Sequence, residues 1–226
     1  MNILIISDWV DHLIYSEKMK YRMSDVDLVI SCGDLSFNYL DFVMSELNKP
    51  VFYVVGNHLA DKYYKKNMEN RIVLQVPPCF KNLHLKCHTL QKNLLVAGFE
   101  GSGWYNGGPF QYHQWEVFVK LIKLFPKLIY NKLKYGRFLD IFVTHAPPFH
   151  VGDRPDLCHR GLKGFNWFIR VFKPKYHLHG HIHIYDINQP RVTEYHGTKV
   201  INCSGFYKLE IPDVELCGGK QSNVYK

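Results

Sequence analysis

Three histidines alternate along the short segment His179-Gly180-His181-Ile182-His183. In an extended strand, alternate side chains point to the same face, so these three imidazoles would lie together. Neutral imidazole is the commonest metal ligand, and two or three on one segment form a chelate aimed in one direction. The chain has 13 histidines among its 226 residues, so a strand that merely carries histidine explains the segment as well. A metal site is therefore predicted only if other segments supply matching ligands.

Short apolar runs recur along the chain, and helical patterns separate them. Runs such as Leu28-Val29-Ile30 are apolar throughout, which is typical of strands covered on both faces. The predicted strands are Ile3–Ser7, Asp27–Cys32, Val51–Val55, Leu94–Phe99, Asp140–Thr144, Tyr176–Leu178 and Lys199–Cys203. The predicted helices are Asn38–Leu47, Gln114–Leu124, Lys127–Lys134 and Gly164–Phe172. Mixed βαβ units of this kind indicate sheets packed together with helices outside.

Two local patterns give more specific expectations. The segment Gln91-Lys92-Asn93 predicts the turn of a hairpin that ends in the strand over Leu94–Phe99. Pro126 is expected to end or kink the helix that starts at Gln114. The apolar stripe of that helix consists of Trp115, Phe118, Val119 and Ile122. We expect this stripe to face the core.

Length and composition are those of a globular α/β chain, with 46% hydrophobic and 21% charged residues. We expect one domain over residues 1–226, with a loosely held tail over 217–226. No apolar run approaches the ~18 residues that would cross a bilayer, and the first residues do not resemble a signal peptide. The six cysteines form no CxxC pair, which favours free thiols and a cytoplasmic location.

The net charge of +8 favours anionic partners such as phosphate esters. Because the lysines are spread widely and no basic arm or nucleic-acid motif is present, a nucleic-acid partner is possible but not favoured. We expect no membrane partner. The sequence does not fix the oligomeric state.

Polar residues of ligand type follow five of the predicted strands. They are Asp8, Asp34, Asn57 with His58, His145, and the pair His181 and His183. Because the carboxyl ends of parallel strands gather at one edge of a sheet, these side chains are expected to converge. Mixed oxygen and nitrogen ligands suit Mn, Fe or Zn, and there are more of them than one ion requires. Two ions roughly 3.5–4 Å apart would clamp an in-line displacement at phosphorus and activate a water.

Each of these positions also has a simpler interpretation. Asp8 and Asp34 could be helix N-caps, and Asn57 a turn residue. His145 could be a hydrogen-bonded histidine before a Pro-Pro turn. Taken together, however, six residues of ligand type at successive strand ends are better explained by a site.

The order and type of these motifs resemble the calcineurin-like metallophosphoesterase superfamily. The motifs are an aspartate after the first strand, Gly33-Asp34, Gly56-Asn57-His58, His145 after a strand, and Gly180-His181-Ile182-His183. The resemblance implies a four-layer α/β/β/α sandwich, with two mixed β-sheets flanked by helices, and a binuclear metal centre.

The resemblance also implies a role for each matching residue. Asp34 would bridge the two ions. Asp8 and His183 would belong to one ion, while Asn57, His145 and His181 would belong to the other. His58 resembles the family's histidine that donates a proton to the leaving oxygen, and His179 falls outside the pattern as a packing or ligand-orienting residue.

The chain departs from the family pattern in two motifs. The first motif is usually Asp-x-His, but valine occupies the third position here, and Val10 cannot bind a metal. His12 could replace the missing histidine if a helical turn begins after Asp8. Leu59 stands where an acidic residue usually follows the GNH motif, so Asp61 is a candidate for orienting His58.

Two further stretches could shape a substrate pocket. The glycine-rich and aromatic loop over 98–112 contains Tyr105 and could serve as a lid, although a purely structural loop explains it equally well. The stretch over 150–161 contains His159 and Arg160, which could contact a phosphate. Tyr105, His159 and Arg160 are therefore the candidate substrate-binding residues.

The leading hypothesis is a metal-dependent phosphodiesterase that acts on a phosphate ester, which could be a nucleotide. In this hypothesis a metal-activated hydroxide attacks phosphorus and His58 is the general acid. One alternative is a non-catalytic scaffold on the same fold, as in the scaffold subunit of retromer, and Val10 is the feature that favours it. Another is a nuclease, which the positive charge favours and which predicts salt-sensitive binding to polynucleotides.

Overall fold

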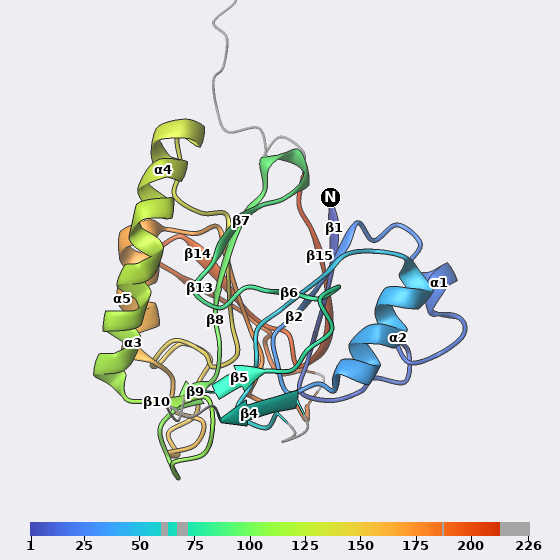
Figure 1. The fold of residues 1–226 in the computed structure, drawn as a ribbon, viewed down its shortest axis with the longest axis horizontal. Coiled ribbons are helices and arrows are strands. Elements are labelled where there is room, and N and C mark those ends of the chain that lie inside the picture. The colour runs from blue at the N-terminus through green and yellow to red at the C-terminus, as the bar shows by residue number, and fades with distance from the viewer. Residues whose placement is uncertain (60–62, 67–71, 187, 213–226) are drawn as a thin grey trace, which may run out of the picture.

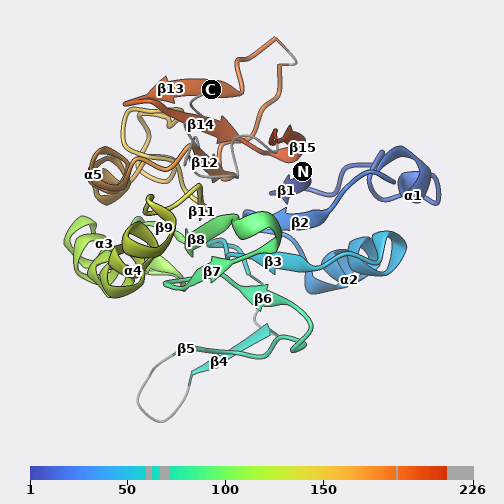
Figure 2. The ribbon, with the colours of Figure 1, turned by 90° about the horizontal axis from the view of Figure 1, so that it is seen from above.

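Two β-sheets pack face to face in the computed structural model, and helices cover the outer face of each (Figures 1 and 2). The structure describes residues 1–59, 63–66, 72–186 and 188–212. The expectations for Asp61 and for the tail over 217–226 lie outside these residues. The predicted four-layer α/β/β/α sandwich is confirmed.

The first sheet has five strands in the order β15-β1-β2-β3-β6. Their bounds are β15 (Gly205–Glu210), β1 (Asn2–Ser7), β2 (Leu28–Ser31), β3 (Val51–Tyr53) and β6 (Lys81–Asn82). Strands β1, β2, β3 and β6 run parallel, whereas β15 pairs antiparallel with β1. The first three predicted strands are therefore confirmed to within a few residues.

The second sheet has six strands in the order β13-β14-β12-β11-β8-β7. Their bounds are β13 (Val192–Tyr195), β14 (Thr198–Asn202), β12 (Tyr176–His179), β11 (Ile141–Thr144), β8 (Leu95–Phe99) and β7 (Cys87–Thr89). The four central strands are parallel, and the two edge strands are antiparallel to their neighbours. The predicted hairpin turn is the short 3₁₀ segment η2 (Gln91–Asn93) between β7 and β8.

Aliphatic side chains from both sheets fill the space between them, including Ile5, Ile30, Val96, Ile141 and Leu178. Helices α1 (Met19–Arg22) and α2 (Phe37–Leu47) cover the outer face of the first sheet. Helices α3 (Gln114–Leu121), α4 (Phe125–Tyr135) and α5 (Lys163–Phe172) cover the second. Two small ribbons complete the described structure: β9 (Ser102–Gly103) with β10 (Gln111–Tyr112), and β4 (Tyr64–Lys66) with β5 (Ile72–Leu74). No helix in the described ranges is long and apolar enough to cross a bilayer.

Helix α3, the 3₁₀ turn η3 (Ile122–Leu124) and α4 follow one another without a break. Pro126 separates two helical pieces as predicted, but it stands in the first turn of α4, where its missing N–H is not needed. Arg137, after α4, binds the buried carboxylate of Asp140 at 2.7 Å and so anchors the return into β11.

The expectation that the stripe of Trp115, Val119 and Ile122 faces the core is wrong. These side chains are 64%, 56% and 54% exposed, and the buried residues of this stretch are Val117, Leu121 and Leu124. Phe118 is half-buried against Trp167 of α5. The helix carries two apolar stripes on opposite faces, and only one of them reaches the sheet.

The neighbouring residues Leu121 and Ile122 provide a matched test of this orientation. Leu121 is fully buried, so Leu121→Ala should lower the free energy of unfolding by about 2–5 kcal/mol. Ile122 is 54% exposed, so Ile122→Ala should change it by no more than about 0.5 kcal/mol. Urea denaturation of the two variants measures both values. Equal losses would show that the helix is oriented differently.

Candidate metal centre

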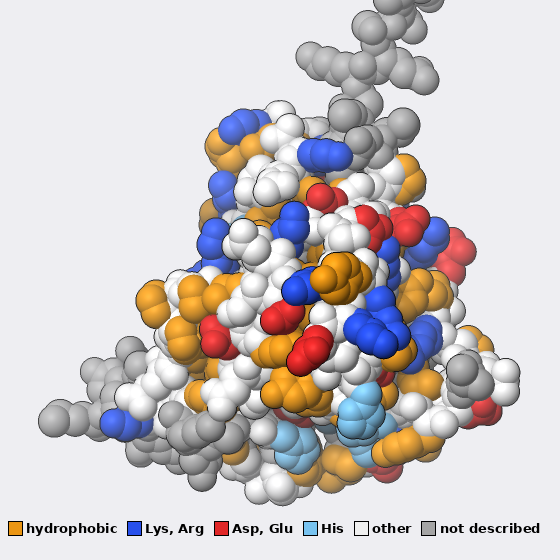
Figure 3. Space-filling model, turned by 90° about the vertical axis from the view of Figure 1, so that its right-hand side faces the viewer, with side chains coloured by type: hydrophobic (Ala, Val, Ile, Leu, Met, Phe, Trp, Pro, Cys, Tyr) orange, Lys and Arg blue, Asp and Glu red, His pale blue; other side chains and the backbone are white. Residues whose placement is uncertain are grey.

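The predicted ligand residues come together at the carboxyl ends of the parallel strands, which is the lower end of the molecule in Figure 1. Asp8 follows β1, Asp34 follows β2, His145 follows β11 and His181 follows β12. Histidine side chains are visible at the same end of the surface in Figure 3. The two sheets therefore contribute to one site from opposite sides of the sandwich.

Three of these residues have a backbone conformation that is uncommon for residues other than glycine. The φ angles are +69° at Asp8, +58° at Asp34 and +67° at His181. Such left-handed conformations cost of order 1–3 kcal/mol each and occur mostly at functional sites. Here they turn the side chains into the space between the strand ends.

A set of hydrogen-bond acceptors converges on His145. Its Nδ1–H donates to the carbonyl of Cys32 at 2.8 Å, which leaves Nε2 as the nitrogen that can bind a cation. Nε2 lies 3.1 Å from Oδ2 of Asp34 and 3.0 Å from Oδ1 of Asn57. The amide of Asn57 is held in this orientation because its Nδ2 donates to the hydroxyl of Tyr105 at 3.1 Å. Three acceptor atoms that face one another in this way need a proton or a cation between them.

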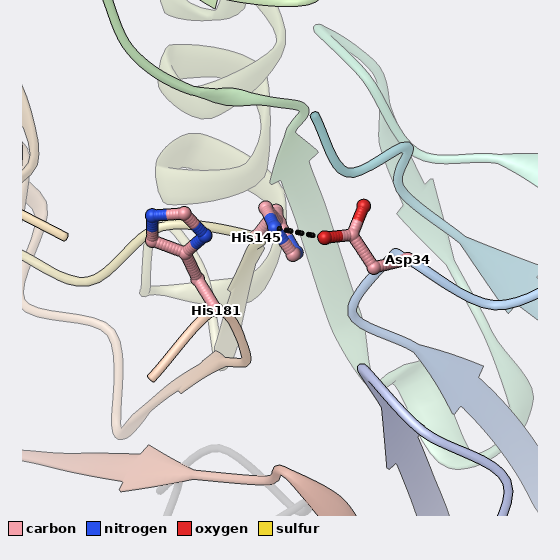
Figure 4. A group of neighbouring side chains, drawn as sticks. All are labelled: Asp34, His145 and His181. Atoms are coloured by element: carbon pink, nitrogen blue, oxygen red, sulfur yellow. Dashed lines mark ion pairs between the residues drawn. The ribbon is translucent and has the colours of Figure 1, made fainter. Parts of the chain in front are cut away.

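His181 completes the group on the other side of His145 (Figure 4). Its Nε2–H donates to the carbonyl of Cys158 at 2.7 Å, so its Nδ1 carries the lone pair. The ring centroids of His145 and His181 are 4.8 Å apart. One ligand atom from each of Asp34, His145 and His181 lies within 4.8 Å of the others, which is a spacing that could hold a metal ion.

The electrostatics of the site match this arrangement. Burial raises the pKa of Asp34, but the charge of His145 and its hydrogen bond outweigh that effect and lower it to about 2. Burial lowers the pKa of His145, but the charge of Asp34 outweighs that effect and raises it to about 9, so without a metal Nε2 carries the proton that a bound cation would displace. Burial lowers the pKa of His181 to about 3, so this ring is neutral, which is the form that binds metals.

Asp8 is fully buried, and only one of its oxygens has a partner. Oδ1 accepts hydrogen bonds from the backbone N–H of His181 at 2.7 Å and from the hydroxyl of Ser7 at 3.0 Å. Oδ2 is buried without a hydrogen-bond partner. Gly180 packs so closely here that a Cβ would collide with Ser7 and Asp8. A buried carboxylate oxygen without a donor fits a bound cation, because burying it unpaired would cost several kcal/mol.

The donor set therefore fits a divalent metal ion. Carboxylate, amide oxygen and imidazole nitrogen are the ligands that Mn, Fe and Zn accept. The hydrogen bonds from His145 to Cys32 and from His181 to Cys158 fix which ring nitrogen is available. Both acceptors are backbone carbonyls, so no side-chain pattern in the sequence could have identified them.

The remaining predicted residues lie around this group. His58 is exposed, and its backbone N–H donates to Oδ1 of Asp34 at 2.9 Å. His183 is partly buried, and its carbonyl accepts from Nη2 of Arg154 at 2.8 Å. His12 is exposed on the turn after Asp8, with no hydrogen bond to that carboxylate within the described ranges. His179 is buried, and its Nδ1 bonds to the carbonyl of Gly180.

Two loops bring further candidate residues to the site. Tyr105 reaches Asn57 from the loop over 98–112, and the His159 ring lies 5.3 Å from that of His181. Arg160 is exposed, and its guanidinium donates to the carbonyl of Pro155 rather than to the ligand group. The stretch over 150–161 thus contacts the site through His159 and the Cys158 carbonyl.

A buried polar network that the sequence did not reveal supports the first of these loops. Glu100 follows β8 near the start of this loop, and the hydroxyl of Tyr112 donates to its Oε1 at 2.8 Å. Burial raises the pKa of Glu100 to about 7, and burial lowers the pKa of His84 to about 3. When both side chains are neutral, the 3.5 Å contact between His84 and Glu100 is a contact of two uncharged polar groups and not an ion pair.

The fold and the site define a four-layer α/β/β/α protein with a candidate metal centre at the strand ends. The family model of the calcineurin-like phosphoesterases matches residues 1–185, and the chain belongs to this family. It is thus a hydrolase of phosphoric esters that depends on divalent metal.

Solved structures support the fold. One crystal structure is similar at 19% identity and a TM-score of 0.61, covering 92% of this chain and 94% of the other. The protein TT1561 of Thermus thermophilus is similar at 18% identity and a TM-score of 0.60, with 90% and 89% covered. No curated protein matches the chain.

The unpaired oxygen of Asp8 gives a test of metal binding that does not depend on turnover. With a chelator present, Asp8→Asn should leave the melting temperature unchanged or raise it, because an uncompensated buried charge is removed. Mn²⁺ at 100 times its dissociation constant should stabilise the wild type by about 2.7 kcal/mol and the variant far less. Differential scanning calorimetry measures both, with Asp41→Asn, an exposed carboxylate on α2, as the control. An equal Mn²⁺ response in Asp8→Asn would exclude Asp8 as a ligand.

The raised pKa of Glu100 predicts a pH-dependent stability. Between pH 4.5 and about 7 the folded protein keeps a proton on Glu100 that the unfolded chain releases, so stability falls as the pH rises. The free energy of unfolding of the wild type should fall by about 3 kcal/mol over this pH range. Glu100→Gln has no titrating carboxyl at this position, so this fall should be absent from the variant. Urea denaturation of both proteins at pH 4.5 and 7.5 gives the difference. A wild-type-minus-variant difference that does not change with pH would contradict the prediction.

Proposed function

We propose that the protein is a phosphodiesterase that uses two divalent metal ions. The observation that carries this proposal is the convergence of Oδ2 of Asp34, Oδ1 of Asn57 and Nε2 of His145 next to the unpartnered oxygen of Asp8. In the metal-free protein a proton on Nε2 of His145 pairs this atom with Asp34 and Asn57, but the buried oxygen of Asp8 still has no donor. Divalent cations would replace that proton and satisfy all of these acceptors.

In this proposal the carboxylate of Asp34, which lies beside Nε2 of His145, would serve both ions. Asn57, His145 and His181 would hold one ion. Asp8 and His183 hold the other, and His12 is too exposed to be assigned to it. When bound, divalent ions of Mn, Fe or Zn would neutralise charge on the phosphate oxygens and lower the pKa of a bound water.

His58 is proposed as the general acid. Its backbone is tied to Oδ1 of Asp34, which fixes its position at the rim of the centre, while its side chain is exposed and free to approach a bound ester. An imidazole so placed would give a proton to the departing alkoxide. Tyr105 and His159 flank the same rim and are the proposed contacts to the substrate, with Arg160 as a further cation on the loop.

A nucleotide or other diester is the favoured substrate class, because a poor alkoxide leaving group makes most use of a proton donor. A cytoplasmic location is proposed with it. The described cysteines are all free thiols, which fits a reducing compartment.

A non-catalytic scaffold is the second candidate function. Val10, which replaces the ligand of the family's first motif, is 40% exposed and has no side-chain atom that could bind a metal. The ion beside Asp8 would then have few protein ligands and would bind weakly. In a scaffold, Mn²⁺ would stabilise the fold without supporting turnover.

Hydrolysis of aryl phosphodiesters in Mn²⁺ tests the proposed function and the role of His58 together. His58→Ala should lower kcat by about 10²–10⁴ for a phenyl leaving group and by less for p-nitrophenyl, because the better leaving group needs no proton. The same esters as monoesters should be hydrolysed more slowly by the wild type.

The matched control is His196→Ala, which removes an exposed histidine from the turn between β13 and β14. It should keep wild-type rates. An equal effect of His58→Ala on both leaving groups would rule out its role as proton donor. No turnover of any ester with several metals would favour the scaffold.

A further inference from the structure

The outward stripe of the α3–η3–α4 segment continues well beyond the residues noticed in the sequence. Its members recur at intervals of three, four or seven residues, which keeps them on one face of a helix, and they are large, apolar and exposed. They are Trp115, Val119, Ile122, Ile129 and Leu133, at 64%, 56%, 54%, 53% and 82% exposure. Tyr130 lies beside them at 45%. We call these six side chains the α3–α4 stripe.

This stripe is not part of the core. The opposite face of the same segment supplies the buried residues Val117, Leu121, Leu124 and Leu128. Figures 1 and 2 show α3 and α4 on the outer side of the second sheet, with none of the described elements beyond them. An apolar stripe of about six turns on an outer surface is larger than the scattered apolar residues of an ordinary protein surface.

Apart from Glu116 in the first turn of α3, the charges along the stripe are all positive. From Val117 to Leu139 the sequence contains no aspartate or glutamate. The lysines of this stretch are Lys120, Lys123, Lys127, Lys132 and Lys134. No ion pair joins any of these five to a carboxylate in the ranges that the structure describes. Lys127 and Lys134 instead lie over the ring of Tyr130, at 4.4 and 5.6 Å from its centroid.

We propose that the α3–α4 stripe docks the protein on the surface of an anionic lipid bilayer. Aliphatic side chains and a tryptophan flanked by lysines are what a helix needs in order to lie in the interface of such a bilayer. The apolar side chains would enter the acyl boundary, while the lysine stems extend to the headgroups. This proposal departs from the expectation of no membrane partner. Attachment of this kind needs no membrane-spanning helix, so it is compatible with the described helices, none of which could span a bilayer.

The charge distribution favours a bilayer over a second copy of the chain. Two copies that met through this stripe would bring ten lysines together with only the two Glu116 carboxylates of the same stretch to balance them. The helical segment from Gln114 to Tyr135 is roughly 33 Å long at 1.5 Å per residue, and members of the stripe occur from its first turn to its last. A bilayer surface is continuous and does not require exact positions of the inserted side chains, so it fits an apolar stripe that extends along a whole helical segment.

Flotation with lipid vesicles tests the proposal. The protein should float with vesicles of equal parts phosphatidylglycerol and phosphatidylcholine, and binding should weaken as salt is raised. It should bind vesicles of phosphatidylcholine alone at least about tenfold more weakly. Ile129→Ser with Leu133→Ser should lower binding to the mixed vesicles by about tenfold or more, because the inserted apolar area is lost. Lys123→Glu with Lys127→Glu should do the same.

The controls change an exposed aromatic residue and an exposed lysine on the other side of the molecule. Tyr21 of α1 is 73% exposed and Lys18 is exposed beside it, so Tyr21→Ser and Lys18→Glu should leave vesicle binding unchanged. Circular dichroism checks that every variant is folded. Hydrolysis of a soluble ester without vesicles should be unchanged in the stripe variants, because no stripe residue belongs to the metal centre.

Four outcomes would overturn the proposal. They are no flotation at low salt, equal binding to neutral vesicles, binding that the serine variants retain, and a dimer by light scattering that the serine variants convert to monomer. The third would indicate a purely ionic attachment, and the last would identify the stripe as a contact between copies.

Discussion

Two carboxylates, Asp8 and Asp34, are buried at the end of an otherwise apolar sandwich, and much of the local structure depends on that constraint. An ion taken out of water costs several kcal/mol unless charge and hydrogen bonds compensate it. Asp34 is compensated by His145 and by the backbone N–H of His58. Asp8 is compensated at one oxygen only. The strained φ angles and the close approach of Gly180 follow from the need to hold these groups together.

The sequence predicted the layers correctly, and it identified the strand ends at which the candidate ligands lie, because both depend on short-range patterns. Strands buried on both faces are continuous apolar runs, and a polar residue that ends such a run marks the edge of the sheet. The orientation of each ligand could not be predicted in this way. It depends on the backbone carbonyls of Cys32 and Cys158, which come from distant loops and have no side-chain signature.

The stripe of Trp115, Val119 and Ile122 shows a different limit of sequence reasoning. Periodicity identifies a helix and its apolar rows, but this segment has two rows on opposite faces. Both satisfy the spacing of a core-facing helix. Only tertiary packing decides which row meets the sheet, and it selected Val117, Leu121 and Leu124. The buried network of Glu100, His84 and Tyr112 was missed because its members are far apart in the chain.

The pairing of β15 with β1 also constrains how the chain folds. Strand β1 lies inside the first sheet, yet one of its two neighbours is formed by residues Gly205–Glu210. The hydrogen bond from the amino group of Met1 to the carbonyl of Ile211 closes a loop of 210 residues. Contacts of such high sequence separation slow folding, since the entropy of loop closure must be overcome before they form. On the ribosome, β1 and β2 would wait with an open apolar edge until nearly all of this sequence had emerged, which makes that edge a natural target for chaperones.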